Sequence, residues 1–189
     1  MRHGVSLIQL LGMQMNADQI IKRAKFPKDL DKVLCIYRDY IGSASVNLDF
    51  QDNEKDFRNL SQQYSGKDSV IFLAWYKGKV IGCAAFRRVN STECEIKRVY
   101  VRPAARGGGV GLNLINTVIE SAKKNGYRKI YLDVLPEFDV ATKLYESIGF
   151  EPTEPITYNP VPGTKFLGLD ISKDAEQKAQ ADAQKARST

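Results

Sequence analysis

The stretch of sequence that decides the fold is residues 93–111, which read ECEIKRVYVRPAARGGGVG. Residues 93–101 alternate like a half-buried strand, and Pro103 closes that strand because proline cannot donate to a sheet ladder. Glycine then fills four of the five positions from Gly107 to Gly111, directly before an amphipathic helical pattern. A strand, a glycine loop and a helix are therefore predicted in this order at the centre of the chain.

The glycine loop, residues 106–111, is predicted to bind an anionic group. At the N-terminus of a helix, backbone N–H groups point at the ligand and the helix dipole favours negative charge. Glycines let the backbone approach phosphates closely, and Arg106 adds a fixed cation. A plain flexible turn explains the loop less well, because so many glycines lower helix propensity without an offsetting gain.

Three kinds of phosphate site compete for this loop. A dinucleotide fingerprint requires Gly-x-Gly-x-x-Gly after a parallel strand, and a nucleoside-triphosphate loop requires Gly-Lys-Ser/Thr at its end. Here the glycine spacing is different, the loop follows a predicted three-strand meander, and Gly111 precedes Leu112-Asn113. A site for the pyrophosphate arm of coenzyme A fits best.

Hydrophobic periodicity predicts five elements before residue 93. Two of them flank Lys77-Gly78-Lys79, which has the composition of a tight hairpin turn. The five are a strand over residues 20–24, helices over 28–41 and 52–64, and strands over 69–76 and 80–89.

After the glycine loop we expect a helix over about residues 111–124, a strand over 129–135, and a helix capped by Asp139 and ended by Gly149. Two further strands are expected from Phe150 onward and over 165–171. The element order is β-α-α-β-β-β-α-β-α-β-β. This order predicts a mixed α/β (α+β) fold with a mostly antiparallel sheet flanked by helices. The apolar stripe of the helix after the loop is expected to comprise Leu112, Ile115, Val118, Ile119 and Ala122.

The length of 189 residues corresponds to about one domain. We expect residues 1–18 to be an N-terminal extension, 19–171 to form a single domain, and 172–189 to be a flexible polar tail. No apolar run approaches the ~20 residues that crossing a bilayer requires, and the apolar patch near the N-terminus is too short for a signal peptide. No membrane partner is therefore expected.

Charge and side-chain chemistry narrow the function further. The net charge of +6 suits a polyanionic partner, but no dense Lys/Arg run with interleaved aromatics predicts nucleic-acid binding. Cys35, Cys83 and Cys94 lack paired spacing and are expected to be free, mostly buried thiols in a reducing cytoplasm. His3 is the only histidine, which argues against a histidine-based triad and a histidine-ligated metal. Acid–base chemistry must then use carboxylates, tyrosine, lysine or water.

Arg106-x-x-Gly109-x-Gly111 resembles the acetyl-CoA signature of the GCN5-related N-acetyltransferases (the GNAT superfamily). Residues 95–106 resemble that family's fourth strand and its approach to the loop, and Leu144–Phe150 resembles its later helix-to-strand motif. The likeness covers roughly residues 19–171. The pairing of CEIKRVYVRP with the late YNPVPG segment at 158–163 is similar to a subgroup of small bacterial members.

The resemblance implies a fold, a cofactor and a reaction. Acetyl-CoA would lie against the fourth strand, and the acetyl group would pass to an amine. One departure concerns Phe138, which stands where many relatives carry an asparagine that contacts the cofactor arm. The resemblance also implies that homodimers can form. The implied cofactor-binding residues are Val99, Tyr100, Val101, Arg106, Gly107, Gly108, Gly109, Val110, Gly111 and Leu112.

Amide formation requires a neutral amine, and an alkyl ammonium has a pKa of about 10, so a base is needed. Glu95 matches a glutamate that some relatives use, and it alternates in step with Val99; a salt-bridged strand glutamate is the alternative. Glu93 shares its phase and is the second candidate. Tyr145 is the candidate acid for the departing thiolate, and a core tyrosine is the alternative interpretation.

The acceptor is less defined by the sequence. In the family's fold it binds between the loop after the first helix and the last hairpin. A small amine, such as an amino acid, is the preferred acceptor; a protein or peptide amine, or cofactor binding without turnover, are the alternatives. The candidate acceptor-binding residues are Tyr40, Asn47, Phe50, Arg87, Tyr158 and Asn159, with Arg88 as an alternative to Arg87.

Overall fold

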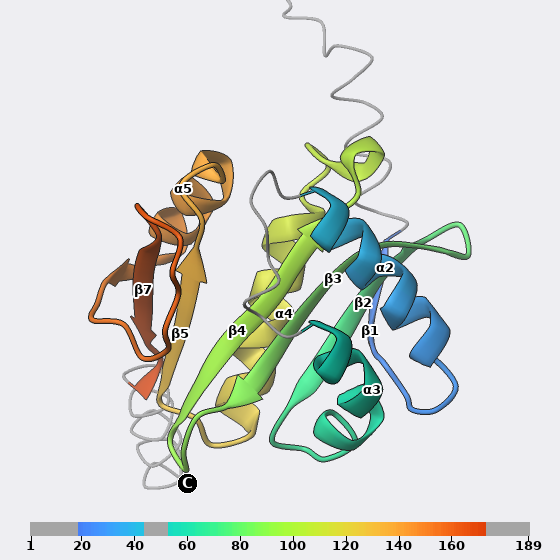
Figure 1. Ribbon diagram of the computed structural model, residues 1–189, viewed down its shortest axis with the longest axis horizontal. Helices are drawn as coiled ribbons and strands as arrows, with labels where there is room; N and C mark the ends of the chain where they lie inside the picture. The colour runs from blue at the N-terminus through green and yellow to red at the C-terminus, as the bar shows by residue number, and fades with distance from the viewer. Residues whose placement is uncertain (1–18, 44–52, 173–189) are drawn as a thin grey trace, which may run out of the picture. The chain divides into compact units, whose positions relative to one another are not determined.

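The computed structural model describes residues 19–43 and 53–172. Within these residues, the strands form one seven-stranded sheet in the order β1-β2-β3-β4-β5-β7-β6 (Figure 1). The elements are β1 Ile20–Arg23, α2 Leu30–Ser43, α3 Asn53–Gln63, β2 Val70–Tyr76, β3 Lys79–Arg88, β4 Glu93–Val101, the 3-10 turn η2 Pro103–Ala105, α4 Val110–Lys124, β5 Lys129–Val134, α5 Asp139–Ile148, β6 Glu151–Pro152 and β7 Lys165–Asp170.

The predicted element order is confirmed, and so is the mostly antiparallel sheet. The pairs β1–β2, β2–β3, β5–β7 and β6–β7 are antiparallel, whereas β4 and β5 run parallel. The parallel pair follows from the glycine loop and α4, because a helical crossover returns the chain in the same direction. Most predicted boundaries lie within one or two residues of the observed ones.

The chain divides into two compact units. In its described part, the first unit comprises residues 19–43, 53–86 and 97–118, and the second comprises 87–96 and 119–172. Strands β3 and β4 and helix α4 each contribute residues to both units.

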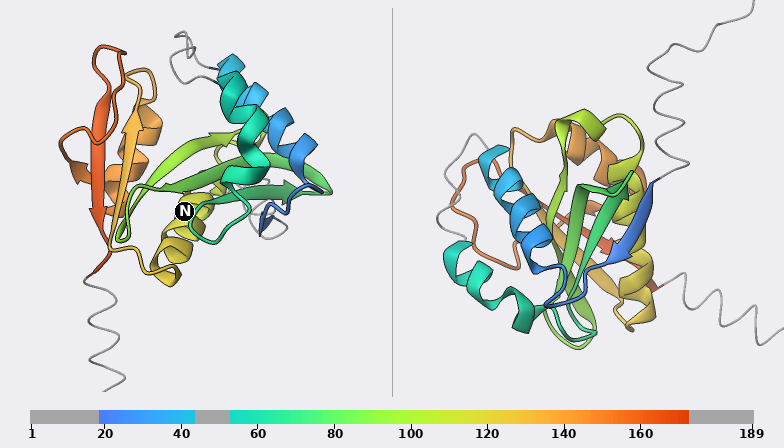
Figure 2. Two further views of the ribbon diagram at one scale, coloured as in Figure 1. Left: turned by 60° about the horizontal axis from the view of Figure 1, so that its bottom comes forward. Right: turned by 90° about the vertical axis from the view of Figure 1, so that its right-hand side faces the viewer.

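In the first unit, α2 and α3 cover one face of the strands, and the first part of α4 lies on the other face (Figures 1 and 2). The amphipathic pattern of α2 accounts for this packing, since Val33, Ile36 and Tyr37 are fully buried. The β2–β3 hairpin closes at Lys77 and Gly78, whose φ angles of 46° and 75° are both left-handed. Two consecutive left-handed residues are typical of a type I′ turn, which suits the twist of paired strands.

In the second unit, α5 lies beside β5 and β7 (Figure 2). Gly149 ends α5 with a left-handed φ of 105°, and the N–H of Phe150 donates to the carbonyl of Tyr145. This arrangement satisfies carbonyl groups that the end of a helix leaves open. The predicted role of Gly149 is therefore confirmed.

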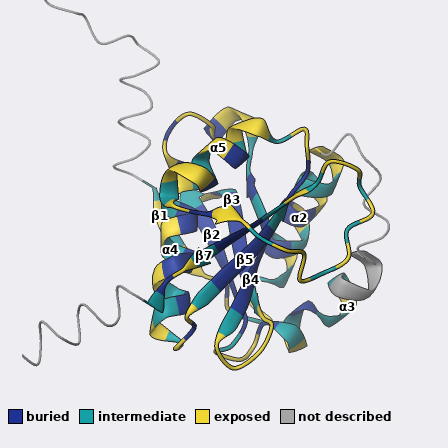
Figure 3. Ribbon diagram, turned by 90° about the vertical axis from the view of Figure 1, so that its left-hand side faces the viewer, coloured by how far each residue is buried: buried dark blue, intermediate teal, exposed yellow. Residues whose placement is uncertain are grey.

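Two local expectations are wrong. Asp139 does not cap α5: Phe138 occupies the cap position without a side-chain hydrogen bond, and Asp139 lies in the first turn. There its carboxylate still faces the positive end of the helix dipole. Leu112 is not in the core stripe of α4, because it is 40% exposed while Leu114 is fully buried. Figure 3 shows that buried residues concentrate along the strands.

Candidate active site

The glycine loop has the geometry of an anion site. Gly107 and Gly109 have φ angles of 80° and 74°, a left-handed conformation that side-chain-bearing residues adopt only at a cost. Helix α4 begins at Val110, and the N–H of Asn113 donates to the carbonyl of Gly109 at 3.0 Å. The amides at the start of α4 therefore have no acceptor within the helix. The first turn of α4 carries no acidic side chain that would repel an anion.

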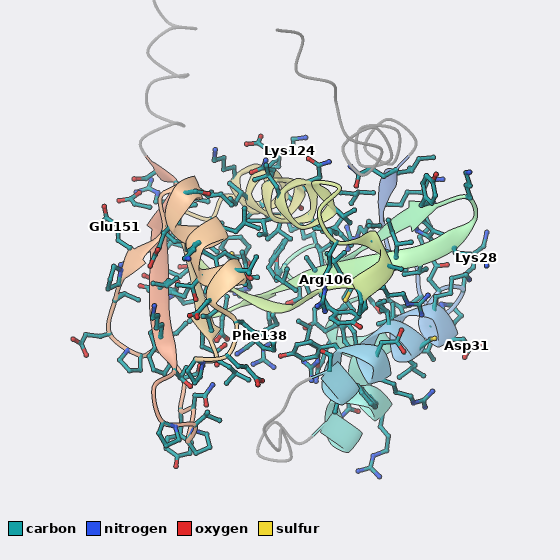
Figure 4. All side chains as sticks on the ribbon, turned by 90° about the horizontal axis from the view of Figure 1, so that it is seen from above. Lys28, Asp31, Arg106, Lys124, Phe138 and Glu151 are labelled. Atoms are coloured by element: carbon teal, nitrogen blue, oxygen red, sulfur yellow. The ribbon has the colours of Figure 1, made fainter. Side chains whose placement is uncertain are left out.

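Arg106 stands at the entrance to this loop (Figure 4). Its Nε–H donates to the carbonyl of Val101 at 3.0 Å, and its guanidinium carbon lies 5.9 Å from the centroid of the Tyr100 ring. Binding through Nε leaves the two terminal nitrogens as further donors. The backbone of β4 thus fixes the cation while the side chain stays exposed.

Tyr100 connects the loop with α2. Its ring is 8% exposed and packs edge-on against Tyr40, with the centroids 6.2 Å apart. Burial, followed by the nearby Asp39 carboxylate, raises the pKa of the Tyr100 phenol, so the ring stays neutral at physiological pH. The first unit therefore brings together Arg106 and Tyr100 from the cofactor prediction and Tyr40 from the acceptor prediction. Val99 and Val101 flank Tyr100 and are half-buried.

Strand β4 contains a local break at Arg98. This residue has a left-handed φ of 53°, although it carries a long side chain and is only 9% exposed. Its guanidinium carbon lies 5.1 Å from the centroid of the Tyr37 ring, and its carbonyl accepts a bond from the Cys83 thiol. A left-handed residue interrupts strict alternation along a strand. The prediction that Glu95 and Val99 share a face assumed strict alternation along the strand. The break at Arg98 makes that assumption invalid.

Glu95 belongs to the second unit and is 2% exposed. The hydroxyl of Thr157 donates to Oε1 of Glu95 at 3.1 Å, and Nη2 of Arg87 lies 4.0 Å from Oε2. Arg87, at the end of β3 in the same unit, is 40% exposed. The structure thus places two predicted site residues, Glu95 and Arg87, next to each other.

Glu93 has different surroundings. Its Oε2 accepts a bond from the Asn90 amide at 2.6 Å, and its Oε1 accepts one from the Tyr131 hydroxyl at 3.0 Å. Both carboxylate oxygens therefore take part in a local network at the start of β4. This arrangement favours a structural role for Glu93. Glu95 remains a candidate base, and the ion pair with Arg87 also fits the salt-bridged alternative.

The predicted acceptor residues of the β6–β7 loop, residues 153–164, differ in their exposure. The amide of Asn159 donates to Oδ2 of Asp133 at 2.6 Å, and its Oδ1 accepts a bond from the N–H of Val161. Tyr158, between Thr157 and Asn159, is 86% exposed. Asn47 and Phe50, the other two predicted acceptor residues, lie outside the described part of the chain.

Tyr145 is 4% exposed on α5, and its ring meets Phe150 edge-on with centroids 5.6 Å apart. This packing satisfies the core interpretation of Tyr145 and does not conflict with an acid role. Phe138 is half-buried at the start of α5 and is labelled in Figure 4. An apolar ring at this position offers no amide to a cofactor arm.

Sequence reasoning missed Thr157 and Asp133. Each lies far in sequence from its partner, 62 residues from Glu95 and 26 from Asn159. No local sequence pattern predicts a contact between residues so far apart in the chain. Within residues 19–43 and 53–172, no cluster of ligating side chains could hold a metal ion. None of the helices in these ranges has the length and apolar character of a membrane-spanning segment.

Comparison with known proteins points to one family. The Acetyltransferase (GNAT) family matches residues 33–150. An uncharacterized N-acetyltransferase of Schizosaccharomyces pombe is 33% identical over 155 residues, covering 81% of this chain and 95% of the relative. The N-acetylaspartate synthetase of Xenopus tropicalis is 33% identical over 110 residues, covering 57% of this chain and 41% of the relative.

A solved structure shares the fold. It is a candidate acetyltransferase of Salmonella typhimurium with its cofactor acetyl-CoA, and it superposes with a TM-score of 0.62 at 20% identity over 82% of this chain and 94% of its own. The family match covers more than half of the 189 residues, and the fold agrees with it. The chain therefore belongs to the GNAT family and is an acetyl-CoA-dependent acyltransferase.

Proposed function

We propose that this protein transfers the acetyl group of acetyl-CoA to the amine of a small molecule, such as an amino acid or a related amine. The observation that carries the proposal is the glycine loop, with two left-handed glycines directly before the N-terminus of α4. This loop provides converging amides and the cation of Arg106 for a pyrophosphate. Family membership supplies the acyl donor.

The residues present fit acetyl-CoA. Gly107, Gly109 and the first amides of α4 would cradle the pyrophosphate, together with Gly108, Val110, Gly111 and Leu112. Leu112 is exposed, so its side chain is accessible at the helix start. A side chain added at Gly107 would meet no atom within 4 Å, so the space beside this glycine is open. Val99, Tyr100 and Val101 would bind the pantetheine arm through their backbone.

The cofactor supplies an activated thioester, and the chain must manage two protons. Glu95 would accept a proton from the acceptor ammonium, directly or through water, so that the nitrogen lone pair can attack the carbonyl carbon. As the C–N bond forms, the C–S bond breaks. Tyr145 would donate its proton to the leaving sulfur, since a phenol with a pKa of about 10 can protonate a thiolate of about 8.5 at low cost.

Two observations support a small acceptor that carries a carboxylate. Arg87 is partly exposed beside Glu95, so it can bind a carboxylate near the candidate base. The Xenopus relative is named an N-acetylaspartate synthetase, and N-acetylaspartate is an acetylated amino acid. Tyr158, which is exposed in the same unit as Glu95, would contribute to the acceptor side. A reducing cytoplasm is the proposed place of action, and the buried free thiols Cys83 and Cys94 support it. A homodimer is proposed from the family alone.

Calorimetric titration with acetyl-CoA tests the donor half of the proposal. Wild type should bind, and Gly109→Glu should not, because it places a negative side chain where the pyrophosphate would lie. Gly78→Glu is the matched control: Gly78 has nearly the same φ, 75° against 74°, but lies in the β2–β3 turn. Equal loss of binding in both variants would attribute the effect to backbone strain and contradict the proposed site.

A thiol-release screen with acetyl-CoA tests the acceptor half. Amino acids should react faster than the same amines without a carboxylate and faster than peptides. Transfer to peptides alone would replace the small acceptor by a protein. Binding of acetyl-CoA without transfer to any amine would reduce the protein to a cofactor-binding module.

A further inference from the structure

The hydroxyl of Thr157 contacts the one fully buried carboxylate among the described residues of the candidate site. It donates to Oε1 of Glu95 at 3.1 Å, and Glu95 is 2% exposed. Thr157 belongs to the β6–β7 loop, whereas Glu95 belongs to β4. This bond therefore links a surface loop to the candidate base.

The two oxygens of Glu95 have different environments. Oε1 accepts the bond from Thr157, and Oε2 lies 4.0 Å from Nη2 of Arg87. A carboxylate is planar and turns easily about its last side-chain bond, so a bond to one oxygen fixes the direction of the other. We propose that Thr157 is a positioning residue that orients Glu95 so that Oε2 accepts the proton of the acceptor ammonium.

A second anchor holds the same loop. Two residues after Thr157, the amide of Asn159 donates to Oδ2 of Asp133 on β5 at 2.6 Å. Thr157 and Asn159 are half-buried, while Tyr158 between them is 86% exposed. Alternate side chains of this segment are thus tied to two neighbouring strands, β4 and β5. This double attachment fixes the hydroxyl of Thr157 well enough to orient its partner.

The attachment also assigns Asn159 a different role. Its side-chain oxygen accepts a hydrogen bond from the N–H of Val161, and its NH₂ group donates to Asp133. Both polar groups of Asn159 therefore hold the loop in place. Of the two predicted acceptor residues in this loop, Tyr158 is the one whose side chain stays exposed. The same short segment therefore contributes an acceptor contact and the orientation of the base.

The role of Thr157 rests on the proposed function, because it acts through Glu95. In the proton step, an N–H bond of the ammonium breaks, an O–H bond forms at Oε2, and the proton later leaves to solvent. Thr157 keeps its own proton throughout. Its contribution is to hold the carboxylate in place, which affects turnover and leaves the binding of acetyl-CoA unchanged.

The test compares three variants of the full chain with wild type, using the best amine from the thiol-release screen. Thr157→Val keeps the shape but removes the donor, and should lower kcat by roughly ten- to a hundred-fold, as expected for the loss of a hydrogen bond to a charged group. Thr157→Ser keeps the donor and should restore kcat to within a few-fold of wild type. Calorimetry should give the same affinity for acetyl-CoA in all of them.

Thr164→Val is the matched control. It removes a hydroxyl of the same loop that donates to the carbonyl of Val161 and does not contact Glu95. Equal kcat values in Thr157→Val and Thr157→Ser would overturn the role of Thr157, as would an equal loss in Thr164→Val. If Thr157→Val does not fold, Thr157→Ala replaces it and is read against the same serine variant. Absence of transfer by wild type would instead overturn the proposed function, and the role of Thr157 with it.

Discussion

Gly82 on β3 lies so close to the carbonyl oxygen of Tyr100 on β4 that a Cβ atom would stand 2.9 Å from it. The same Cβ would lie 3.2 Å from Cδ1 of Leu114 on α4. Glycine at position 82 thus lets β3, β4 and α4 pack together beside the proposed pantetheine-binding segment. The carbonyl oxygen belongs to the backbone, so it cannot move aside as the end of a flexible side chain could.

Gly82→Ala should therefore destabilise the fold by about 1–3 kcal/mol, the usual cost of overpacking. It should also weaken acetyl-CoA binding, because the backbone of Tyr100 has to move. Denaturant unfolding and calorimetry measure the two effects. Gly66→Ala is the control, since a Cβ there meets nothing within 4 Å. An unchanged unfolding midpoint in Gly82→Ala would contradict the close approach.

Tyr145→Phe should lower kcat by about a hundredfold, within the range expected for loss of a general acid. The ring volume and the edge contact with Phe150 are kept, so acetyl-CoA affinity should hardly change. Steady-state kinetics and calorimetry check this prediction. Tyr127→Phe, at another buried tyrosine, should stay active. Full activity of Tyr145→Phe would leave Tyr145 with a packing role only.

Arg87→Met should raise KM for an amino acid roughly ten- to a hundred-fold, because a charge-assisted bond to the carboxylate is lost. The decarboxylated amine should be affected much less. The ratio of kcat/KM for the two acceptors measures the effect. Arg88→Met is the control, because neighbouring side chains point to opposite faces of a strand. A parallel loss for both acceptors would remove Arg87 from carboxylate recognition.

Asp29 should make stability depend on pH in acid. The backbone N–H of Lys25, and then the Lys32 ammonium, hold the pKa of this carboxyl below its ordinary value of 3.8. A lowered folded-state pKa means that Asp29 contributes stability above about pH 4 and loses it as the pH falls through the folded value. Asp29→Asn should thus cost less than about 1 kcal/mol at pH 7 and a smaller amount near pH 3. Equal losses at both pH values in thermal unfolding would contradict the ionised role.

Local signals in the sequence were sufficient for most of the fold. Lys77-Gly78 and Gly149 mark turns because glycine adopts left-handed φ angles cheaply, and the structure has both where they were expected. Arg98 also has a left-handed φ, but arginine carries no signal for it. Tertiary packing against Tyr37 accompanies that conformation, and periodicity in the sequence cannot reveal it.

In the candidate site, too, the local features could be predicted from the sequence and the long-range contacts could not. Gly107, Gly109 and Arg106 form a contiguous motif, so their geometry followed from the sequence. The contact between Thr157 and Glu95 joins residues far apart in the chain, and only the pairing of the strands brings them together. The misplacement of Leu112 has a simpler cause: Leu112 and Leu114 are both apolar, and periodicity alone did not decide which of them faces the core.

The bond between the Nε–H of Arg106 and the carbonyl of Val101 has a thermodynamic consequence. A free arginine side chain loses about 2 kcal/mol of rotamer entropy when a ligand immobilises it. The bond to the strand already restricts the Arg106 side chain, so much of this entropy is lost on folding. Ligand binding then loses less entropy, which favours affinity. Lysine at position 106 would keep the charge but not this attachment, and its ammonium would have to be ordered anew in every binding event.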